Sequence, residues 1–196
     1  MGRWGPDARS RLEQAALELY IERGYERTTV AQIAGRAGLT ERTFFRYFAD
    51  KREVLFGGAA ALQDLIVDAI VSAPEACAPI EAVAVGLEAV GTVFQENVER
   101  SRRRQTVILA NAELQARELS KLAALTSGMK GALRRRGVKD PTASLTAEAG
   151  MVVFRVAFDR WINATHPQDW SRLVRESLGG LRTVMVGDET RVAAQP

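Results

Sequence analysis

Arginine and aromatic side chains are concentrated in TERTFFRYF, residues 40–48. Because residues four apart share a helix face, we expect Arg42 and Arg46 on one side of a helix and Phe44 and Phe48 on another. The two phenylalanines would enter a core and the arginines would face solvent. A guanidinium near a helix N-terminus can donate two hydrogen bonds to O6 and N7 of guanine in the major groove of DNA. The segment could therefore recognise a base pair through Arg42.

Side chains around this arginine suit contacts with the same ligand. Thr40 and Thr43 can bond base edges or phosphates, and Phe45, if exposed, can pack against a thymine methyl group. Tyr47 and Lys51 can reach phosphates. A helix rich in arginine and aromatic residues can equally be an ordinary solvated helix, so the residue types alone leave both interpretations open.

The surrounding sequence predicts short helices that would hold these side chains. Thr29-x-x-Gln32 is a capping box that opens one helix, which stops at Gly38. Thr40 then caps the helix that carries the arginines. Thr29, at a helix N-terminus, is a further candidate phosphate anchor. A cap, a short helix, a glycine, a second cap and a short basic helix within about 20 residues are typical of a helix-turn-helix DNA-binding unit.

The rest of the chain has apolar residues at helical spacing, with no sustained alternation, which predicts an all-α fold. Asp50-x-x-Glu53 is a second capping box, which would open a long amphipathic helix. We expect about nine helices, at 7–23, 29–37, 40–47, 50–72, 80–99, 102–112, 113–136, 142–165 and 168–186. We expect a DNA-binding domain at 1–50, a helical body at 51–186 and a polar tail at 187–196.

Composition argues against most enzyme chemistry. The chain has 196 residues, 46% of them hydrophobic, which is enough to bury a core. Cys77 is the only cysteine and His166 the only histidine, so we expect no intramolecular disulfide, no His/Cys metal site and no Ser-His-Asp triad. No acid/base pair, phosphate loop or nucleotide fingerprint stands out. The sequence therefore predicts a protein that is not an enzyme and needs no cofactor, with a helical enzyme as the rival.

Charge and hydropathy restrict the partners further. The net charge is only +3, and residues 1–56 carry ten basic and eight acidic residues. DNA affinity would therefore depend on where the charges lie and not on their sum. There is no apolar signal-peptide region at the N-terminus and no uncharged stretch of about 18 apolar residues. We expect a soluble, cytoplasmic protein.

Residues 15–56, AALELYIERGYERTTVAQIAGRAGLTERTFFRYFADKREVLF, closely resemble the N-terminal DNA-binding region of the TetR family of transcriptional regulators. Order and spacing agree along the whole segment, roughly a quarter of the chain. The matching features are Ala15-Ala16, Tyr20, Gly24-Tyr25, Thr28-Thr29-Val30, Ile33-Ala34, Ala37-Gly38, Thr40, Thr43, Tyr47-Phe48, Lys51 and Leu55.

The resemblance implies a three-helix DNA-binding head on a helical bundle that binds a ligand and dimerises. It implies operator contacts from a set of head residues: Thr29, Thr40, Arg42, Thr43, Phe45, Tyr47 and Lys51. The chain departs from the family at Phe45, where many members have tyrosine. A phosphate bond through that hydroxyl is then unavailable, and Phe45 would make apolar contact or pack inward.

Two heads about 34–36 Å apart read a palindrome far better than one head, so we expect a homodimer. The helices at 142–165 and 168–186 are apolar enough to be buried on two sides, which a fold core alone could also explain. The resemblance implies that these helices pair with their copies. The dimer candidates are Phe158, Trp161, Leu173, Ser177, Leu181 and Val184.

The resemblance also implies a ligand cavity within the body. The candidate lining residues are Leu62, Leu65, Ile66, Leu87, Phe94, Ile108, Leu122, Met129 and Phe154. Because they are apolar, a small apolar effector would fit best, although ordinary bundle packing explains each residue equally well. The run Arg102–Arg104 could attract an anionic ligand group or could be a solvated helix start.

These observations predict a homodimeric repressor that a small apolar ligand releases from a palindromic operator. Two alternatives stay open at this point. The protein could bind DNA without any ligand, as an architectural or constitutive regulator. It could also activate transcription, because the same contacts with DNA serve both outcomes.

Overall fold

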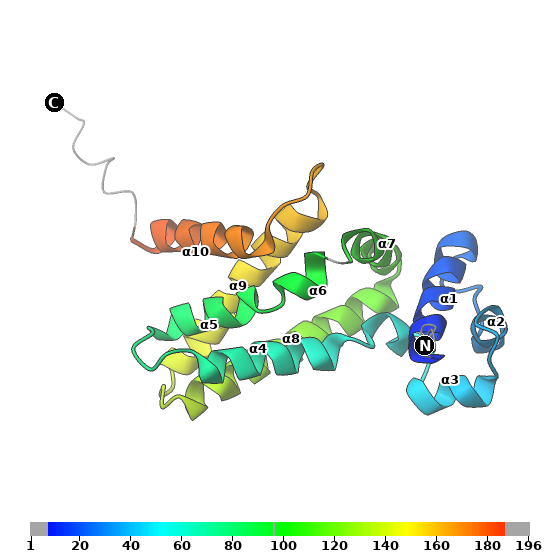
Figure 1. Cartoon of the computed structure of the whole chain (residues 1–196), viewed down its shortest axis with the longest axis horizontal. Helices are drawn as coiled ribbons and strands as arrows, with labels where there is room; N and C mark the ends of the chain where they lie inside the picture. The colour runs from blue at the N-terminus through cyan, green and yellow to red at the C-terminus, as the bar shows by residue number, and fades with distance from the viewer. Residues whose placement is uncertain (1–7, 96, 187–196) are drawn as a thin grey trace, which may run out of the picture. The chain divides into compact units, whose positions relative to one another are not determined.

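The structure is a computed structural model that describes residues 8–95 and 97–186 (Figure 1). Within those residues it contains ten α-helices, one 3-10 helix and no β-strand, which confirms the predicted all-α fold. The chain divides into two compact units. Unit 1 comprises residues 1–61 and 99–121, and unit 2 comprises 62–98 and 122–196. The expected polar tail at 187–196 lies outside the described residues.

Unit 1 is the expected head together with helices from later in the chain. It contains α1 (Ala8–Arg23), α2 (Val30–Arg36), α3 (Glu41–Tyr47), the 3-10 helix η1 (Glu53–Phe56), most of α7 (Val98–Leu109) and the start of α8 (Ala112–Arg135). Leu12, Ile33, Phe44, Ile108 and Leu114 are fully buried in its core. The core of the head is therefore completed by residues more than fifty positions downstream.

The local signals for α2 and α3 are confirmed. The Thr29 hydroxyl accepts a hydrogen bond from the Gln32 N–H at 3.2 Å, and the Thr29 N–H donates to Gln32 Oε1 at 3.0 Å, which completes the capping box. Thr40 caps α3 by accepting from the Thr43 N–H at 3.2 Å. Gly38 follows α2 with a φ of +65°, a left-handed conformation that glycine adopts without steric cost.

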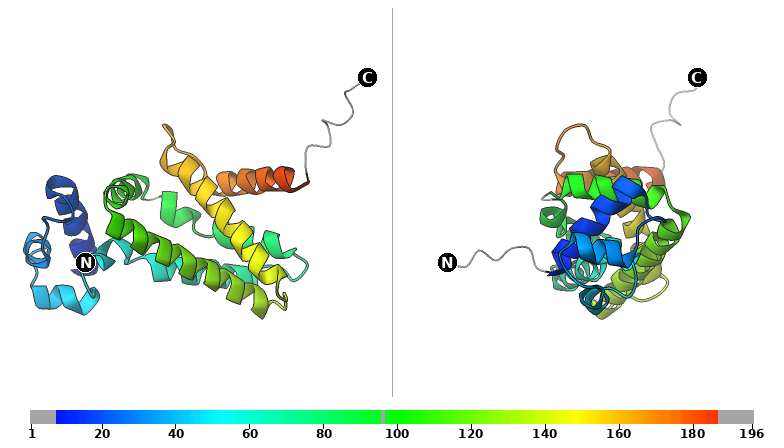
Figure 2. Two further views of the ribbon diagram at one scale, coloured as in Figure 1. Left: turned by 180° about the vertical axis from the view of Figure 1, so that it is seen from behind. Right: turned by 90° about the vertical axis from the view of Figure 1, so that its right-hand side faces the viewer.

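Unit 2 contains α4 (Ala59–Ser72) from Leu62 onward, α5 (Pro79–Glu88), α6 (Gly91–Gln95), the second part of α8, α9 (Thr142–Ile162) and α10 (Trp170–Val186). The helices α5, α9 and α10 pack against one another (Figure 2). An aromatic cluster of Phe94, Phe154, Trp161 and Trp170 lies in the core. The indole N–H of Trp170 donates to the Leu87 carbonyl at 2.6 Å. The polar group of this buried ring therefore has a hydrogen-bond partner.

The prediction of one continuous helix at 50–72 is wrong, because this segment is interrupted. Asp50 does cap the segment, since its carboxylate accepts from the N–H groups of Arg52 and Glu53 at 2.8 and 3.2 Å. The chain then forms only the 3-10 helix η1 before Gly57-Gly58, and α4 begins at Ala59. A Cβ at Gly57 would lie 2.5 Å from Glu13 Oε1 and 3.2 Å from Phe48 Cε1, so a larger residue at this position would have to displace neighbouring side chains.

The helices expected at 80–99 and 102–112 also have different bounds. The first ends at Glu88 and is followed by the short α6, whose first residue Gly91 would place a Cβ 3.3 Å from the Trp170 ring. The second begins already at Val98. Arg102–Arg104 therefore lie inside α7 and do not form a helix start.

Residues Glu53–Ser72 are long and apolar enough to pass a test for a membrane span, with a mean hydropathy of 1.8. The structure gives these residues another explanation. Val54, Leu55 and Phe56 are buried in the core of unit 1, and Ile66 and Ile70 are buried in the core of unit 2. Core packing therefore accounts for these five residues, and 22% of the apolar window as a whole is buried.

Candidate nucleic-acid interface

The helix α3 has one buried face and one exposed face, as the spacing predicts. Phe44 and Phe48 are buried, whereas Arg42 and Arg46 are exposed. Phe45 is 55% exposed, and its ring packs edge-on against Phe44 with the centroids 5.5 Å apart. Of the two positions expected for Phe45, the structure therefore shows the outward one. An exposed aromatic ring beside exposed arginines is suited to apolar contact with a base.

Three threonines lie at the N-terminal ends of the two short helices. Thr29 and Thr40 are both exposed N-cap residues. The hydroxyl groups of Thr40 and Thr43 are 3.0 Å apart and share one hydrogen bond. These hydroxyls thus lie beside the N–H groups of a first helical turn, where a phosphate oxygen is favoured.

The basic side chains of α2 and α3 differ in the hydrogen bonds and ion pairs that they make within the protein. Among the described residues no hydrogen bond or ion pair holds the Arg42 guanidinium. Arg46 lies over the Tyr47 ring and donates to its hydroxyl at 3.1 Å. Arg36 on α2 pairs with Glu22 at 2.8 Å and with Glu18 at 3.5 Å. Arg42 is therefore the side chain of α3 best placed to donate to a base.

Lys51 does not point to solvent in the way that the sequence suggested. Its ammonium donates to the carbonyls of Tyr25, Thr28 and Glu26 at 2.9, 3.1 and 3.4 Å, and it lies 4.2 Å from the centroid of the Tyr25 ring. A lysine ammonium has three donor hydrogens, and three carbonyls surround this one. The group is already occupied without any ligand.

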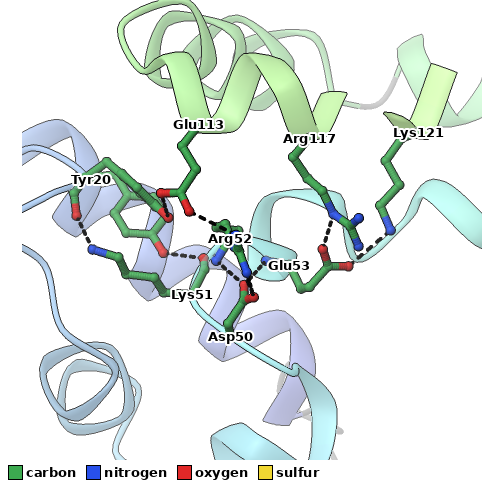
Figure 3. A network of polar contacts seen from close by, with 9 residues as sticks. Tyr20, Asp50, Lys51, Arg52, Glu53, Glu113, Arg117 and Lys121 are labelled. Atoms are coloured by element: carbon green, nitrogen blue, oxygen red, sulfur yellow. Dashed lines mark hydrogen bonds and ion pairs between the residues drawn. The ribbon is translucent and has the colours of Figure 1, made fainter. Parts of the chain in front are cut away.

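The segment between α3 and η1 belongs to a polar network with α8 (Figure 3). Arg52 pairs with Asp50 at 2.5 Å and with Glu113 at 2.9 Å. Glu53 pairs with Arg117 and, at 3.1 Å, with Lys121. These contacts join η1 to the first part of α8 inside unit 1, so the two segments are positioned together.

The network lowers the pKa of its carboxylates. The Arg52 guanidinium holds the pKa of Asp50 below its usual range. Burial alone would raise the pKa of Glu53, but hydrogen bonds from Arg117 and Lys121 outweigh burial and the pKa is lowered. Both carboxylates are therefore stabilised in the charged form at neutral pH.

Two tyrosines pack behind the network. Tyr20 donates from its hydroxyl to the Lys51 carbonyl at 2.6 Å, and Tyr25 donates to Glu113 at 3.2 Å. Their rings meet edge to face with centroids 5.3 Å apart. Burial is the largest cause that raises the pKa of both phenols, so each remains a neutral hydrogen-bond donor.

Arg104 serves the core of unit 1. Its guanidinium donates to the Leu55 carbonyl at 2.7 Å and to Glu118 at 3.1 Å, and it lies over the Phe56 ring. Neither expectation for this run, an anion site or a solvated helix start, describes Arg104. The contact of Arg104 with the Leu55 carbonyl joins α7 to η1, which lies far away in the sequence, so no local signal could have revealed it.

The residues expected to line a ligand cavity do not all come together. Ile108 is buried in the core of unit 1, whereas the others belong to unit 2. In unit 2, Ile66, Leu87, Phe94, Met129 and Phe154 are buried, Leu62 and Leu122 pack against that core, and Leu65 is exposed. A hollow of about 390 Å³ lies elsewhere, between α1 and α2 in unit 1, beside Arg11, Glu18 and Arg36.

The dimer candidates are divided between the core and the surface of unit 2. Trp161, Leu173 and Ser177 are buried within the chain itself. Phe158 and Leu181 are partly buried, and Val184 is 80% exposed. Three further apolar residues are exposed on α9, namely Leu145, Val152 and Val156. Their separations of seven and four residues place them on one helix face.

Two family models match the chain. The model of bacterial regulatory proteins of the tetR family matches residues 13–56, and the model of the MftR C-terminal domain matches residues 77–186. Within residues 8–95 and 97–186 there is no cluster of three or more His, Cys, Asp or Glu side chains able to hold a metal ion.

Among curated relatives, the regulator TcmR of Streptomyces glaucescens is 39% identical over 82 residues, which span 42% of this chain and 36% of that protein. The putative mycofactocin biosynthesis transcriptional regulator MftR of Mycobacterium tuberculosis is 29% identical over 177 residues, which span 86% of this chain and 84% of MftR. The similarity to MftR thus extends over both units.

Solved structures of similar fold include the SmeT–triclosan complex, with a TM-score of 0.64, 20% identity and 96% coverage of each chain. SmeT is the repressor of a multidrug efflux pump of Stenotrophomonas maltophilia. FadR of Thermus thermophilus in complex with lauroyl-CoA has a TM-score of 0.56, 23% identity and coverage of 96% of this chain and 98% of FadR. With a tetR-type head and an MftR-type C-terminal domain matched along most of its length, the chain belongs to the TetR family of transcriptional regulators.

Proposed function

We propose that the protein is a homodimeric repressor that binds a palindromic operator and releases it when a small apolar ligand binds. The observation that carries the proposal is the exposed face of α3, where Arg42 and Phe45 stand on a helix anchored by two buried phenylalanines. Arg42 would donate to a guanine and Phe45 would pack against a thymine methyl group. Thr29, Thr40, Thr43 and Tyr47 would contact phosphates or base edges.

Dimerisation is part of the proposal because one short recognition helix contacts too few base pairs for specific binding. The exposed face of α9 with Leu145, Val152 and Val156 and the exposed Val184 on α10 are the apolar surfaces that support a second copy here. We expect a charge on this face, in Val156→Glu, to give monomers in sedimentation equilibrium while the helical content is retained.

The ligand is proposed to be apolar because the core of unit 2 is lined by aliphatic and aromatic side chains. FadR has bound lauroyl-CoA, which has an apolar acyl chain on a charged coenzyme A group, and SmeT has bound triclosan; these complexes support an effector with an apolar part through the shared fold. Both compounds serve as probes of operator release. If neither these nor other apolar compounds lower DNA affinity, the ligand-independent regulator is the better interpretation. A cytoplasmic location accords with this function.

The deciding experiment is selection of random DNA duplexes on the full-length protein at near-physiological salt. We expect an enriched palindrome, and we expect Arg42→Ala to weaken its binding by about 1–3 kcal/mol and to relax preference at one base pair per half-site. Arg135→Ala is the matched control, since Arg135 is an exposed arginine of unit 2. Equal losses in the two variants, or no enriched sequence, would contradict the proposal. A reporter gene behind the selected operator separates repression from activation.

A further inference from the structure

Lys51 joins two parts of the head that are distant in sequence. Its ammonium is surrounded by the carbonyls of Tyr25, Glu26 and Thr28, which form the turn between α1 and α2. Its own carbonyl accepts a hydrogen bond from Tyr20 at 2.6 Å. Both the main chain and the side chain of this lysine are therefore fixed by the protein.

The turn that Lys51 holds leads directly to the N-cap of α2. Gly24 has a φ of +85°, and the buried Thr28 donates from its hydroxyl to the Gly24 carbonyl at 2.9 Å. The next residue is Thr29, whose hydroxyl caps α2. Three carbonyls that point the same way repel one another, and an ammonium among them stabilises this conformation. The position of Thr29 thus depends on the contacts of Lys51.

We propose that Lys51 promotes operator binding as a positioning residue, which sets the turn that presents Thr29, and that it is not a phosphate contact. This replaces the assignment drawn from the sequence and rests on the proposed function. To bind a phosphate, the ammonium would have to give up carbonyls that it already contacts at 2.9 and 3.1 Å. Within the described residues the ammonium is paired with no carboxylate, and its three hydrogens are directed at main-chain carbonyls.

The two roles differ in their dependence on salt. Each phosphate contact releases counterions, so removing one contact lowers the slope of log K against log salt by about 0.9. Removing a positioning contact lowers the affinity at every salt concentration and leaves the slope unchanged. A variant of Lys51 therefore distinguishes the roles even when both predict weaker binding.

The experiment measures operator affinity of wild type and Lys51→Met by fluorescence anisotropy over a series of KCl concentrations, well below the melting temperature. We expect binding about tenfold weaker, the effect of losing a hydrogen bond to a charged group, with the slope of wild type. Arg42→Ala is measured in parallel as a contact variant. A slope lower by about 0.9 in Lys51→Met would overturn the proposal.

A double-mutant cycle with Thr29→Ala tests the path of the effect. If Lys51 acts through Thr29, the double variant binds about as weakly as the weaker single variant, whereas independent phosphate contacts give losses that multiply. Amide exchange should rise at residues 25–30 in Lys51→Met and stay low in α3, which a general loss of stability would not produce. Multiplying losses, or equal exchange in both segments, would overturn the proposal.

A second variant covers the case in which Lys51→Met does not fold. Lys51→Gln has no charge but keeps amide donors for the carbonyls of the turn. We expect it to restore part of the affinity with the slope of wild type, and a lowered slope would refute the positioning role. Failure of wild type to select any DNA sequence would instead refute the proposed function, so the two failures are distinguishable.

Discussion

In unit 1, several basic side chains bind main-chain carbonyls at the ends of helices, whereas in unit 2 Arg136 makes contacts of this kind and a cluster of aromatic rings lies in the core. Arg104 donates to the Leu55 carbonyl and Lys51 to the turn after α1. In unit 2 the rings of Phe94 and Trp170 meet edge to face with centroids 4.6 Å apart. Hydrogen bonds are directional and fix geometry, while apolar packing tolerates rearrangement more readily. This difference would suit the proposed roles of the two units, a rigid unit that binds DNA and an adaptable unit that binds a ligand.

We expect the largest loss of stability from a change in the aromatic cluster of unit 2. Trp170→Ala should lower the free energy of unfolding of unit 2 by about 3–5 kcal/mol, because it removes a fully buried ring and leaves the Leu87 carbonyl unpaired. Amide exchange measures the result, with protection lost in α5 and α9 and retained in α3. Trp170→Phe is the milder control. Equal loss of protection in α3 would show that the two units do not unfold separately.

The corresponding change in unit 1 is Arg104→Met. It keeps the apolar stem but leaves the Leu55 carbonyl and the Glu118 carboxylate without their shared donor. We expect a loss of about 1.5–3 kcal/mol in thermal or denaturant unfolding, the usual range for a hydrogen bond to a charged group. Arg103→Met, its neighbour on α7, should cost less than about 0.5 kcal/mol. If both changes cost the same, directional bonds do not determine the stability of unit 1.

A smaller effect tests how closely the helices of unit 2 approach. A Cβ at Gly86 would lie 2.6 Å from Ile70 Cγ1 and 2.9 Å from the Ile66 carbonyl oxygen, so Gly86→Ala must displace α4 from α5. We expect a cost of about 1–3 kcal/mol in denaturant unfolding. Gly131→Ala on α8 is the control, because nothing lies within 4 Å of its added methyl group, and it should stabilise the helix by up to about 1 kcal/mol. A harmless Gly86→Ala would mean that unit 2 adapts more readily than its packing implies.

The smallest expected effect is a stability difference that is present at neutral pH and disappears in acid. Glu53 has a lowered pKa, so its contacts with Arg117 and Lys121 stabilise the fold fully above the unfolded value of about 4.3, and this contribution is lost as the pH falls through the folded pKa. Glu53→Gln should therefore be less stable than wild type at pH 7 and equal to it near pH 2. Denaturant unfolding of unit 1 across this range measures the difference. Glu148→Gln on the exposed face of α9 should show no such trend.

Sequence could predict the parts of the fold that depend on neighbouring residues. The caps Thr29 and Thr40 and the glycine stop at Gly38 are local signals, and all three are confirmed. The outward face of α3 followed from helical spacing alone. The break at Gly57-Gly58 had no such reliable signal, because Gly179-Gly180 lie inside α10 without ending that helix.

The remainder depends on tertiary contacts that no local pattern encodes. Ile108 looked like a cavity residue because it is apolar and lies on a central helix, yet it completes the core of unit 1. Arg136, directly after α8, donates to carbonyls at the end of α4, at Ile70 and Ala73, which lie more than sixty residues earlier in the sequence. Apolar periodicity shows that a face is buried and not which partner buries it. The DNA and dimer contacts stay predictions for the same reason.

The internal contacts of the basic residues in unit 1 have a consequence for how the protein finds its site. Arg9 and Arg11 donate to the Gly57 and Ala37 carbonyls, and Arg36 is neutralised by glutamates. These three side chains are then less free to hold a phosphate backbone regardless of sequence, and such holding underlies sliding along DNA. We expect short residence on random DNA, and a search for the operator by many brief encounters followed by one long-lived complex.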